Sequence, residues 1–405
     1  MASASSTSLR LALDFASNWE IRGGVWRYGI ELARALVKLV GAEHVTLPCF
    51  DHLPAERMTE LQATGAKVVA TTWSQRFDHL DALRTRNGRF IPWKRVLPWV
   101  YSPQRRQRLL QSTLGDAQVY HALLSCRGQP RAGATVGTIH DLIPLLHAEA
   151  AGFAKERFLA MVEDHRRWAE RVIVPSQATM NDLVEHLQFP AERIRVVYHG
   201  IDHEQFHAGV PFATSLLKQH GLQPGKYLLY VGALEKRKNI ERLVEAYLQA
   251  LGDRRDMPLV LSGSVIHEMP VLKAALADGT GRVRHIGYVG DGDLPGLYRG
   301  ARALLHVALA EGFGFTPLEA MACGTPVIAS KQTATGEVVA EGGLLVDAYS
   351  LEEIAQAIRR VTSEDALHDN LAHRGMARAK QFTWSRCAEQ TLTVYREAYQ
   401  QWEAR

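Results

Sequence analysis

Two glutamates flank a glycine turn in the segment EGFGFTPLEAMACGTP, which begins at Glu311. The second acid, Glu319, follows eight residues later, and neither carboxylate has an obvious metal-binding partner nearby. The turn precedes a predicted short helix, which leaves the N–H groups of Phe315 and Thr316 at a helix N-terminus, where anions bind. A phosphate on these amides, with a hydroxyl-bearing group beside it, would use both the turn and the acids.

The same segment also permits a purely structural interpretation. Thr316 would be the N-cap of the helix, Pro317 its first residue, and Glu319 the glutamate that satisfies a backbone N–H in a capping box. The spacing Gly312-x-Gly314-x-x-Pro317 is a near miss to a dinucleotide-binding fingerprint, since proline replaces the third glycine and the turn comes late in the chain. An NAD-dependent enzyme is therefore disfavoured.

A cluster of cations lies in the segment VGALEKRKN, residues 231–239, which leaves a predicted strand and enters a predicted helix. Lys236, Arg237 and Lys238 would stand beside the positive end of that helix, where cations are disfavoured unless an anion binds. Arginine holds phosphate oxygens with two hydrogen bonds and lysine adds a point charge. Gly23-Gly24, before the first predicted helix, could present another N–H to the same anion. The alternative is a solvated basic turn.

A further candidate is His140, in the segment TIHDLIP at the end of a predicted buried strand. A single histidine is more often structural than catalytic. The carboxyl ends of parallel strands, however, are where ligands bind in open α/β sheets, and this position favours a role for His140 in a cleft.

The elements that position these residues follow from length and periodicity. A chain of 405 residues suits two domains. Short apolar runs alternate with helical periodicity over the first half and again from about residue 226, which predicts two α/β units with parallel sheets facing each other across a cleft. The predicted strands are 9–15, 45–50, 66–70, 117–120, 135–139, 172–174 and one within 193–202, then 227–232, 258–263, 283–288, 301–308 and 325–330.

Composition restricts the class of protein. Apolar residues make up 46% and charged residues 22%, which is typical of a globular protein. No apolar run approaches the ~20 residues of a membrane span, and the start MASASSTS lacks the features of a signal peptide. The four cysteines have no zinc or disulfide spacing. We therefore expect a cytoplasmic protein with reduced cysteines.

Basic and aromatic residues are concentrated between residues 84 and 110. This segment contains eight Arg or Lys, no acid, and four aromatic residues. Such a composition suits the headgroup layer of an anionic membrane or an acceptor that carries phosphate. The alternative is a solvated loop. No nucleic-acid recognition motif accompanies the segment, so nucleic acid is not an expected partner.

Taken together, the motifs above and the segments around them resemble those of the retaining glycosyltransferases of family 4. The resemblance covers nearly the whole chain, in family order, and its most specific mark is the pair of glutamates separated by seven residues. It implies an α/β protein of the GT-B type, with an N-terminal Rossmann-like acceptor domain (1–205), a C-terminal Rossmann-like donor domain (206–384), and a final helix (385–405) that returns to the first domain. The blocks that carry it are GGVWRYGIELARAL, TIHDLIP, VIVPSQATMNDL, YHGID, VGALEKRKNIERLVEAY, EGFGFTPLEAMACGTPVIAS and FTWSRCAEQTLTVYREAY.

The resemblance also implies a role for each candidate residue. Glu311 would hold hydroxyls of the donor sugar, Glu319 would accept from the ribose diol, and His140 would lie beside the transferred sugar. Arg237 and Lys238 would clamp the diphosphate. Many family members carry arginine directly after the glycine of the VG turn, where this chain has Ala233, so we expect Arg237 to supply that guanidinium. The other donor-binding residues are expected to be Gly23, Gly24, Gly232, Gly314, Phe315, Thr316, Tyr288 and Val289.

The implied reaction is transfer of a hexose from a nucleotide sugar to an acceptor hydroxyl, with retention of configuration and without metal or cofactor. The form of the basic turn resembles bacterial mannosyl- and rhamnosyltransferases of surface polysaccharide. GDP-mannose is therefore the expected donor, and UDP-glucose, dTDP-rhamnose and an inactive binding or scaffold protein are the alternatives. The expected acceptor is a glycan or a polyprenyl-diphosphate-linked glycan, with residues 84–110 as a contact to the inner membrane face.

Overall fold

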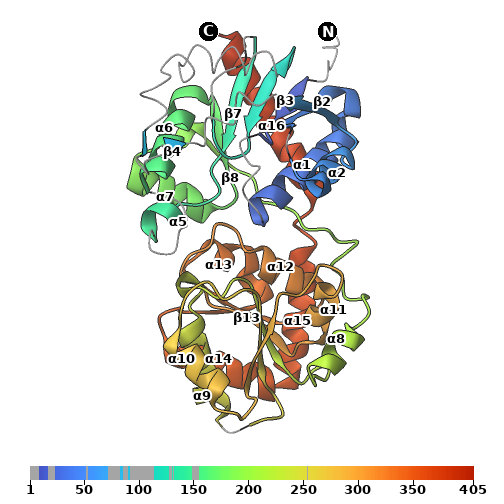
Figure 1. Cartoon of the computed structure of the whole chain (residues 1–405), viewed down its shortest axis with the longest axis vertical. Helices are drawn as coiled ribbons and strands as arrows, with labels where there is room; N and C mark the ends of the chain where they lie inside the picture. Colours follow the sequence, from blue (N-terminus) through green and yellow to red (C-terminus); the bar gives the residue numbers. More distant parts are fainter. Residues whose placement is uncertain are drawn as a thin grey trace.

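The computed structural model describes residues 9–16, 23–51, 53–71, 83–84, 90–91, 114–126, 130, 132–147, 155–252 and 254–405. Two parallel sheets organise the described chain, and each is covered by helices to form one half of the molecule (Figure 1). The predicted α/β class with two Rossmann-like halves is therefore confirmed. None of the helices in the described part of the chain combines the length and apolar character that a bilayer crossing needs.

The sheet of the N-terminal half has seven parallel strands in the order β3-β2-β1-β6-β7-β8-β9. The chain builds outward from β1 in one direction, then crosses to β6 and builds outward in the other. Such a reversal opens a crevice at the carboxyl ends of the two central strands, where ligands bind. The strands are β1 (Leu11–Leu13), β2 (Val45–Phe50), β3 (Lys67–Thr71), β6 (Val119–Ala122), β7 (Ala134–Thr138), β8 (Arg171–Val174) and β9 (Ile194–Val196).

The sheet of the C-terminal half repeats this plan with six parallel strands in the order β12-β11-β10-β13-β14-β15. Its reversal lies between β10 and β13, and three of its strands, β10, β12 and β13, lead directly to predicted site residues. A short antiparallel pair, β4 (Leu83–Arg84) and β5 (Phe90–Ile91), stands apart from both sheets. The six strands are β10 (Leu228–Val231), β11 (Leu259–Ser262), β12 (Val283–Gly287), β13 (Ala303–His306), β14 (Val327–Ser330) and β15 (Leu344–Val346).

Helices cover both faces of each sheet, as buried parallel strands require. In the N-terminal half α1 and α16 share one apolar cluster, and α6 contributes to a second. In the C-terminal half α9, α10 and α14 lie in one cluster, and α11 and α12 in another. The helices are α1 (Gly24–Val40), α2 (Ala55–Gln62), α5 (Ile143–Leu146), α6 (Lys155–Trp168), α7 (Gln177–Leu187), α8 (Thr214–Gln219), α9 (Ile240–Leu251), α10 (Pro270–Ala277), α11 (Leu294–Gly300), α12 (Phe315–Ala322), α13 (Ala334–Val339), α14 (Leu351–Ser363), α15 (Asp365–Ala379) and α16 (Trp384–Glu403).

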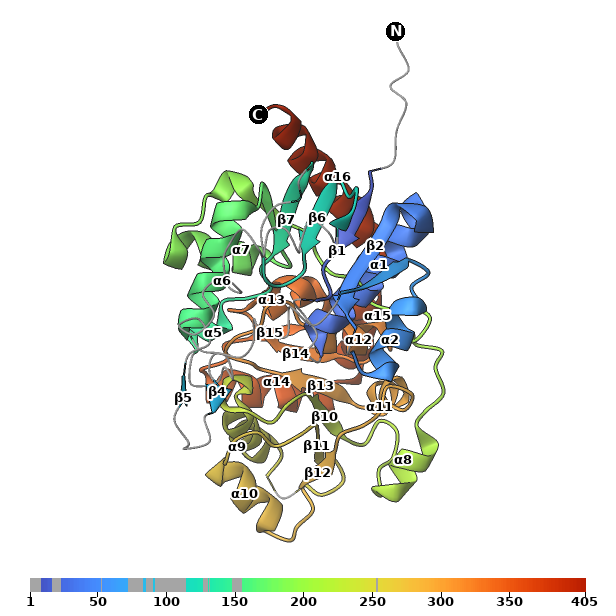
Figure 2. The ribbon, with the colours of Figure 1, turned by 45° about the horizontal axis from the view of Figure 1, so that its top comes forward.

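The last helix, α16, follows the C-terminal half in the chain but lies in the N-terminal half, beside α1 and β7 (Figure 2). Its apolar face explains this position, because Leu392 and Tyr395 belong to the same buried cluster as the first strand. The Tyr395 hydroxyl lies 2.7 Å from Nδ1 of the buried His121 on β6. We propose residues 205 and 384 as the domain boundaries on either side of this return.

Candidate active site

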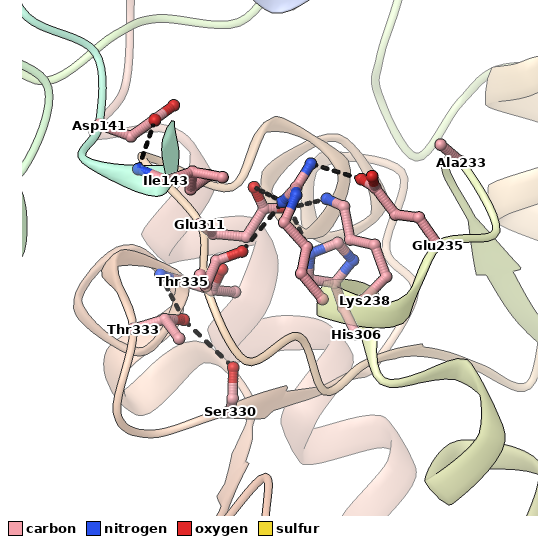
Figure 3. A network of polar contacts seen from close by, with 12 residues as sticks. Asp141, Ile143, Ala233, Glu235, Lys238, His306, Glu311, Ser330, Thr333 and Thr335 are labelled. Atoms are coloured by element: carbon pink, nitrogen blue, oxygen red, sulfur yellow. Dashed lines mark hydrogen bonds and ion pairs between the residues drawn. The ribbon is translucent and has the colours of Figure 1, made fainter. Parts of the chain in front are cut away.

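A cluster of charged side chains lies where β10 and β13 end. Lys238 donates to Glu311, and Nε2 of His306 lies 3.0 Å from the same carboxylate oxygen (Figure 3). The guanidinium of Arg237 lies 3.4 Å from the other Glu311 oxygen and 2.6 Å from Glu235. The structure thus brings together the predicted pair of cations and the first predicted glutamate, and adds Glu235 and His306, which the sequence did not identify.

Burial and charge act in opposite directions in this cluster. Burial alone would raise the pKa of Glu311, but Lys238, His306 and Arg237 together hold that pKa well below its usual range. Burial lowers the pKa of His306, so the imidazole is neutral at neutral pH. Two cations therefore face two carboxylates, and the cluster is close to neutral overall. The sequence suggested that these cations need a bound anion. In the structure, Glu235 and Glu311 already compensate their charge.

The local backbone explains how Lys238 becomes buried. The three basic residues form a 3-10 turn, Lys236–Lys238, and α9 begins only at Ile240. Between them Asn239 adopts a left-handed conformation with φ 61°, and its amide donates to Val307 at 3.1 Å and Ala348 at 2.7 Å. These bonds offset the backbone strain and turn Lys238 inward, while Lys236 remains exposed. The solvated alternative is therefore wrong for two of the three cations.

The two glycines of the turn after Glu311 have different roles. Gly314 precedes α12 with φ 110°, a conformation that favours glycine. Gly312 has ordinary backbone angles, but a Cβ there would lie 2.5 Å from the carbonyl oxygen of His140. The second glycine position thus shapes the turn, whereas the first allows the N-terminal half to approach it.

The predicted capping box is wrong. The N-cap of α12 is Gly314 rather than Thr316, and no side chain caps the helix. The helix begins at Phe315, so the N–H groups of Phe315 and Thr316 do lie at its N-terminus. Glu319 is buried in the interior of the helix, where it accepts from Arg27 of α1 and, at 3.0 Å, from the hydroxyl of Tyr298. Its carboxylate therefore accepts hydrogen bonds from side chains rather than capping the backbone of the helix.

His140 lies at the carboxyl end of β7 and reaches the interface between the halves. Its Nε2 lies 2.9 Å from the carbonyl oxygen of Leu123, which can only accept, so Nε2 carries the proton and Nδ1 is an acceptor. Burial lowers the pKa of His140 to about 4, and the ring is neutral at neutral pH. His140 can accordingly accept a hydrogen bond from a ligand hydroxyl but is not a proton donor to it.

Acid should destabilise the N-terminal half, because burial lowers the pKa of His121 to about 3 and those of His140 and His165 to about 4, from a usual 6.5. Between those values and 6.5 the unfolded chain binds more protons than the folded chain, so stability falls as pH falls below about 6.5. Each histidine contributes up to about 1.4 kcal/mol per pH unit. Melting temperatures measured from pH 7 to pH 5 should therefore decline steeply. His373→Ala, which removes an exposed histidine, should keep the same slope, and a flat profile would contradict the assignment.

Further contacts across the interface were not anticipated from sequence. Glu337 of α13 accepts from the N–H groups of Gln177 at 2.8 Å and Ala178 at 3.1 Å, at the N-terminus of α7. The Ser176 hydroxyl donates to the carbonyl oxygen of Gly312 at 3.0 Å. Both contacts join the two halves beside the glycine turn, so the described arrangement is a closed one.

His199 is another residue that the sequence did not single out, although it belongs to the quoted block YHGID. Its ring is buried and stacks on Phe315 at 5.4 Å, with 11° between the planes, and lies 6.0 Å from the ring of His140. It therefore packs the start of α12 against the predicted sugar-binding histidine.

Tyr288 and Val289, two of the expected donor-binding residues, follow β12, which lies beside β11, and β11 lies beside β10 in the sheet. Gly232, Gly263 and Gly287 end or follow β10, β11 and β12, and a Cβ on Gly263 would lie 1.9 Å from the carbonyl oxygen of Gly232. The side chain of Tyr288 is 76% exposed and that of Val289 is buried. The structure thus offers backbone groups and one exposed ring at these strand ends.

The two remaining expected donor-binding glycines, Gly23 and Gly24, lie at the start of α1. Gly23 has φ 88° and precedes α1, and a Cβ on Gly24 would lie 3.6 Å from the Phe315 ring. The N-termini of α1 and α12 therefore meet across the interface.

Of the basic segment 84–110, only the backbone of residues 84, 90 and 91 is described, so its membrane contact lies outside the described residues. Within the described ranges, no group of three or more His, Cys, Asp or Glu is arranged to hold a metal ion.

Two family descriptions match the chain. "Glycosyltransferase Family 4" matches residues 22–205, and "Glycosyl transferases group 1" matches residues 214–378. The first match includes every strand of the N-terminal sheet except β1, which precedes it, and the second spans the C-terminal sheet. Together they include every residue of the Glu311 cluster, His140 and Glu319.

Two curated relatives are mannosyltransferases of Escherichia coli. O-antigen chain mannosyltransferase B is 35% identical over 231 residues, which are 56% of this chain and 61% of the relative. Serotype-specific mannosyltransferase WbdA is 28% identical over 267 residues, which are 63% of this chain and 32% of the relative. The chain thus spans less than two thirds of either relative.

Solved structures support the fold. HepE from Anabaena, determined in complex with UDP and glucose, superposes with a TM-score of 0.71 at 20% identity, over 96% of this chain and 100% of that chain. At this identity the similarity concerns the fold alone. With both family matches in order along the two sheets, the chain belongs to glycosyltransferase family 4, and its second half is a group 1 glycosyltransferase domain.

Proposed function

We propose that the chain is a retaining hexosyltransferase that transfers mannose from GDP-mannose to a glycan or lipid-linked glycan in surface polysaccharide synthesis. The observation that carries the proposal is the cluster of Lys238, Arg237 and Glu311 at the strand ends, with the backbone of His140 from the other half close to the turn after Glu311. The mannosyltransferase relatives favour mannose as the sugar and a polysaccharide as the product.

The electrostatic task of such an enzyme is to stabilise the leaving diphosphate. In the structure Lys238 is paired with Glu311, and the cluster is close to neutral. When hydroxyls of the donor sugar donate hydrogen bonds to Glu311, its carboxylate is shared between these hydroxyls and the two cations. Lys238 and Arg237 can then bind the phosphates. The uncapped N–H groups of Phe315 and Thr316 would add two fixed donors, and preorganised donors of this kind lower the barrier most where charge develops.

The donor sugar would lie between Glu311 and His140. His140 accepts with Nδ1, so it suits a hydroxyl of the sugar and cannot protonate the leaving group. A displacement by Glu311 is also disfavoured, because three side chains hold its carboxylate. We propose same-face attack: the acceptor oxygen bonds to the anomeric carbon as the bond to the diphosphate breaks, and a diphosphate oxygen takes the acceptor proton. A glycosyl group found on Glu311 in a trapped enzyme would overturn this mechanism.

The second glutamate, Glu319, favours a nucleotide that contains ribose over one that contains deoxyribose. A carboxylate accepts two hydrogen bonds from the 2′- and 3′-hydroxyls of a ribose but only one from a 2′-deoxyribose. GDP and UDP sugars therefore fit Glu319 better than a dTDP sugar does. UDP-glucose remains the second donor, and residues 84–110 remain the proposed contact with an anionic membrane or with a polyprenyl-diphosphate acceptor.

A melting panel in EDTA tests the proposal. GDP, UDP, dTDP and their common sugars are added in turn, and a ligand at about 100 times its dissociation constant adds about 2.7 kcal/mol, a shift of several degrees. We expect the largest shift with GDP or GDP-mannose, and turnover that survives EDTA. No shift with any nucleotide would contradict the proposal and favour a binding or scaffold protein.

A further inference from the structure

Arg27 makes the ion pair that joins the two halves at the second glutamate. It lies in the first turn of α1, and its guanidinium donates to Oε1 of Glu319 on α12, 292 residues further along the chain. The guanidinium also lies 5.4 Å from the ring centre of Phe206 and 5.7 Å from that of Phe315. One side chain of the N-terminal half is thus seated among three residues of the other part of the chain.

This contact covers the carboxylate on which the proposed ribose site depends. The side chain of Glu319 is only 4% exposed, whereas that of Arg27 is 33% exposed. The other partner of Glu319, Tyr298, is fully buried within the same half as the carboxylate. Arg27 is therefore the partner that reaches solvent, and the one that a ligand can move without disturbing the core.

Each oxygen of the Glu319 carboxylate already accepts one hydrogen bond, and little of the carboxylate is exposed to accept another. Arg27 donates to Oε1 and the Tyr298 hydroxyl donates to Oε2. A ribose diol needs exposed acceptor surface, which a carboxylate at 4% exposure does not offer. A nucleotide can thus engage Glu319 only after the contact with Arg27 opens.

We propose that Arg27 is a positioning residue of the nucleotide site: it holds the Glu319 carboxylate while the site is empty, and the ribose hydroxyls of the nucleotide displace it. This inference rests on the proposed function, in which Glu319 binds ribose. Arg27 acts on the ligand through Glu319, so it lowers nucleotide affinity in proportion to the strength of the contact that must open.

The physical chemistry of a buried carboxylate supports this exchange. Burial raises the pKa of Glu319, and Arg27 and Tyr298 oppose that rise. Leaving a buried acceptor without partners is costly, so a carboxylate that loses Arg27 must gain equivalent donors. A vicinal diol provides two such donors, and a sugar without hydroxyls provides none. Exchange with a ribose is therefore favourable, whereas a dideoxyribose should leave Arg27 in place.

The test uses Arg27→Met, which keeps a side chain over Phe206 and Phe315 but removes the cation. Calorimetry measures binding of the nucleoside diphosphate that shifts the melting point most, GDP on the present proposal, and of its 2′,3′-dideoxy counterpart. Arg27→Met should bind GDP about tenfold more tightly, the size of one charge-assisted hydrogen bond, and should bind dideoxy-GDP unchanged. Arg27→Lys should restore an affinity close to the wild type.

Controls separate this inference from the function on which it rests. Arg34→Met removes a cation of the same helix that pairs only with Glu31 among the described ion pairs, and it should not change either affinity. Weaker or equal GDP binding by Arg27→Met would overturn the exchange, and so would an equal gain for both nucleotides. If the wild-type chain binds neither GDP nor UDP, the proposed function fails as well. If Arg27→Met is unfolded by circular dichroism, the ratio of GDP to dideoxy-GDP affinity of Arg27→Lys decides, and a ratio unlike that of the wild type would overturn the exchange.

Discussion

Lys238→Ala should lower turnover by about 10²- to 10³-fold, which is the usual loss when one preorganised charge donor is removed from a reacting site. Lys238 donates to Glu311 and its side chain is 10% exposed, so water cannot replace its charge. The leaving diphosphate would lose its point charge, and Glu311 would be left with Arg237 and His306. Initial rates with GDP-mannose and a mannosyl acceptor measure the effect.

The buried position of Lys238 makes the choice of controls important. Removing one partner from a buried ion pair lowers stability, although two partners of Glu311 remain. Lys238→Met preserves the volume, and both variants should show the same loss of turnover if charge is the cause. Lys236→Ala changes an exposed lysine of the same turn and should stay within about twofold of the wild type. Folded Lys238 variants with near-normal turnover would refute the role of Lys238.

Gly312→Ala should lower kcat/KM by about 10²-fold without unfolding either half. The added Cβ would lie 2.5 Å from the carbonyl oxygen of His140 and 3.0 Å from Cβ of Asp141, so the two halves must move apart. The backbone of Gly312 is not left-handed, and alanine therefore adds no strain within the turn. Since a misplacement of about 1 Å can cost 10²-fold in rate, separating His140 from Glu311 should be severe.

A matched alanine tests whether the close approach is the cause. Gly292 is exposed, also has ordinary backbone angles, and would have no atom within 4 Å of an added Cβ. Gly292→Ala should behave as the wild type, and Gly312→Ala should melt within a few degrees of it. Unchanged kcat/KM in Gly312→Ala would show that closure does not depend on this contact.

Sequence periodicity predicted the strands of both sheets well, because buried parallel strands are short apolar runs that glycine and polar segments interrupt. The predicted strand 135–139 is β7 at Ala134–Thr138, and the predicted strand 258–263 contains β11 at Leu259–Ser262. The strand β15 was missed, because Leu344–Val346 is short and only one of its three residues is buried. A three-residue run carries too little pattern to be separated from a loop.

Local pattern failed where a side chain had a choice of partners. Thr316 and Glu319 have the spacing of a capping box, but Glu319 bonds to Arg27 and Tyr298, and the N-cap is Gly314 instead. The cap and the long-range contact use the same carboxylate, and spacing alone cannot rank them. The stronger, charge-assisted bond to Arg27 is available only when the two halves meet.

The sequence by itself determined the fold class, the family, and the identity of Glu311, Arg237, Lys238 and His140 as site candidates, since these depend on short motifs and on periodicity. The tertiary structure alone decided the pairing of Arg27 with Glu319 and of Lys238 with Glu311, which are 292 and 73 residues apart. It also decided that His140 is neutral, because burial lowers its pKa to about 4. Pairing and burial depend on which strand ends and helix N-termini meet across the interface, and no local stretch of sequence contains that information.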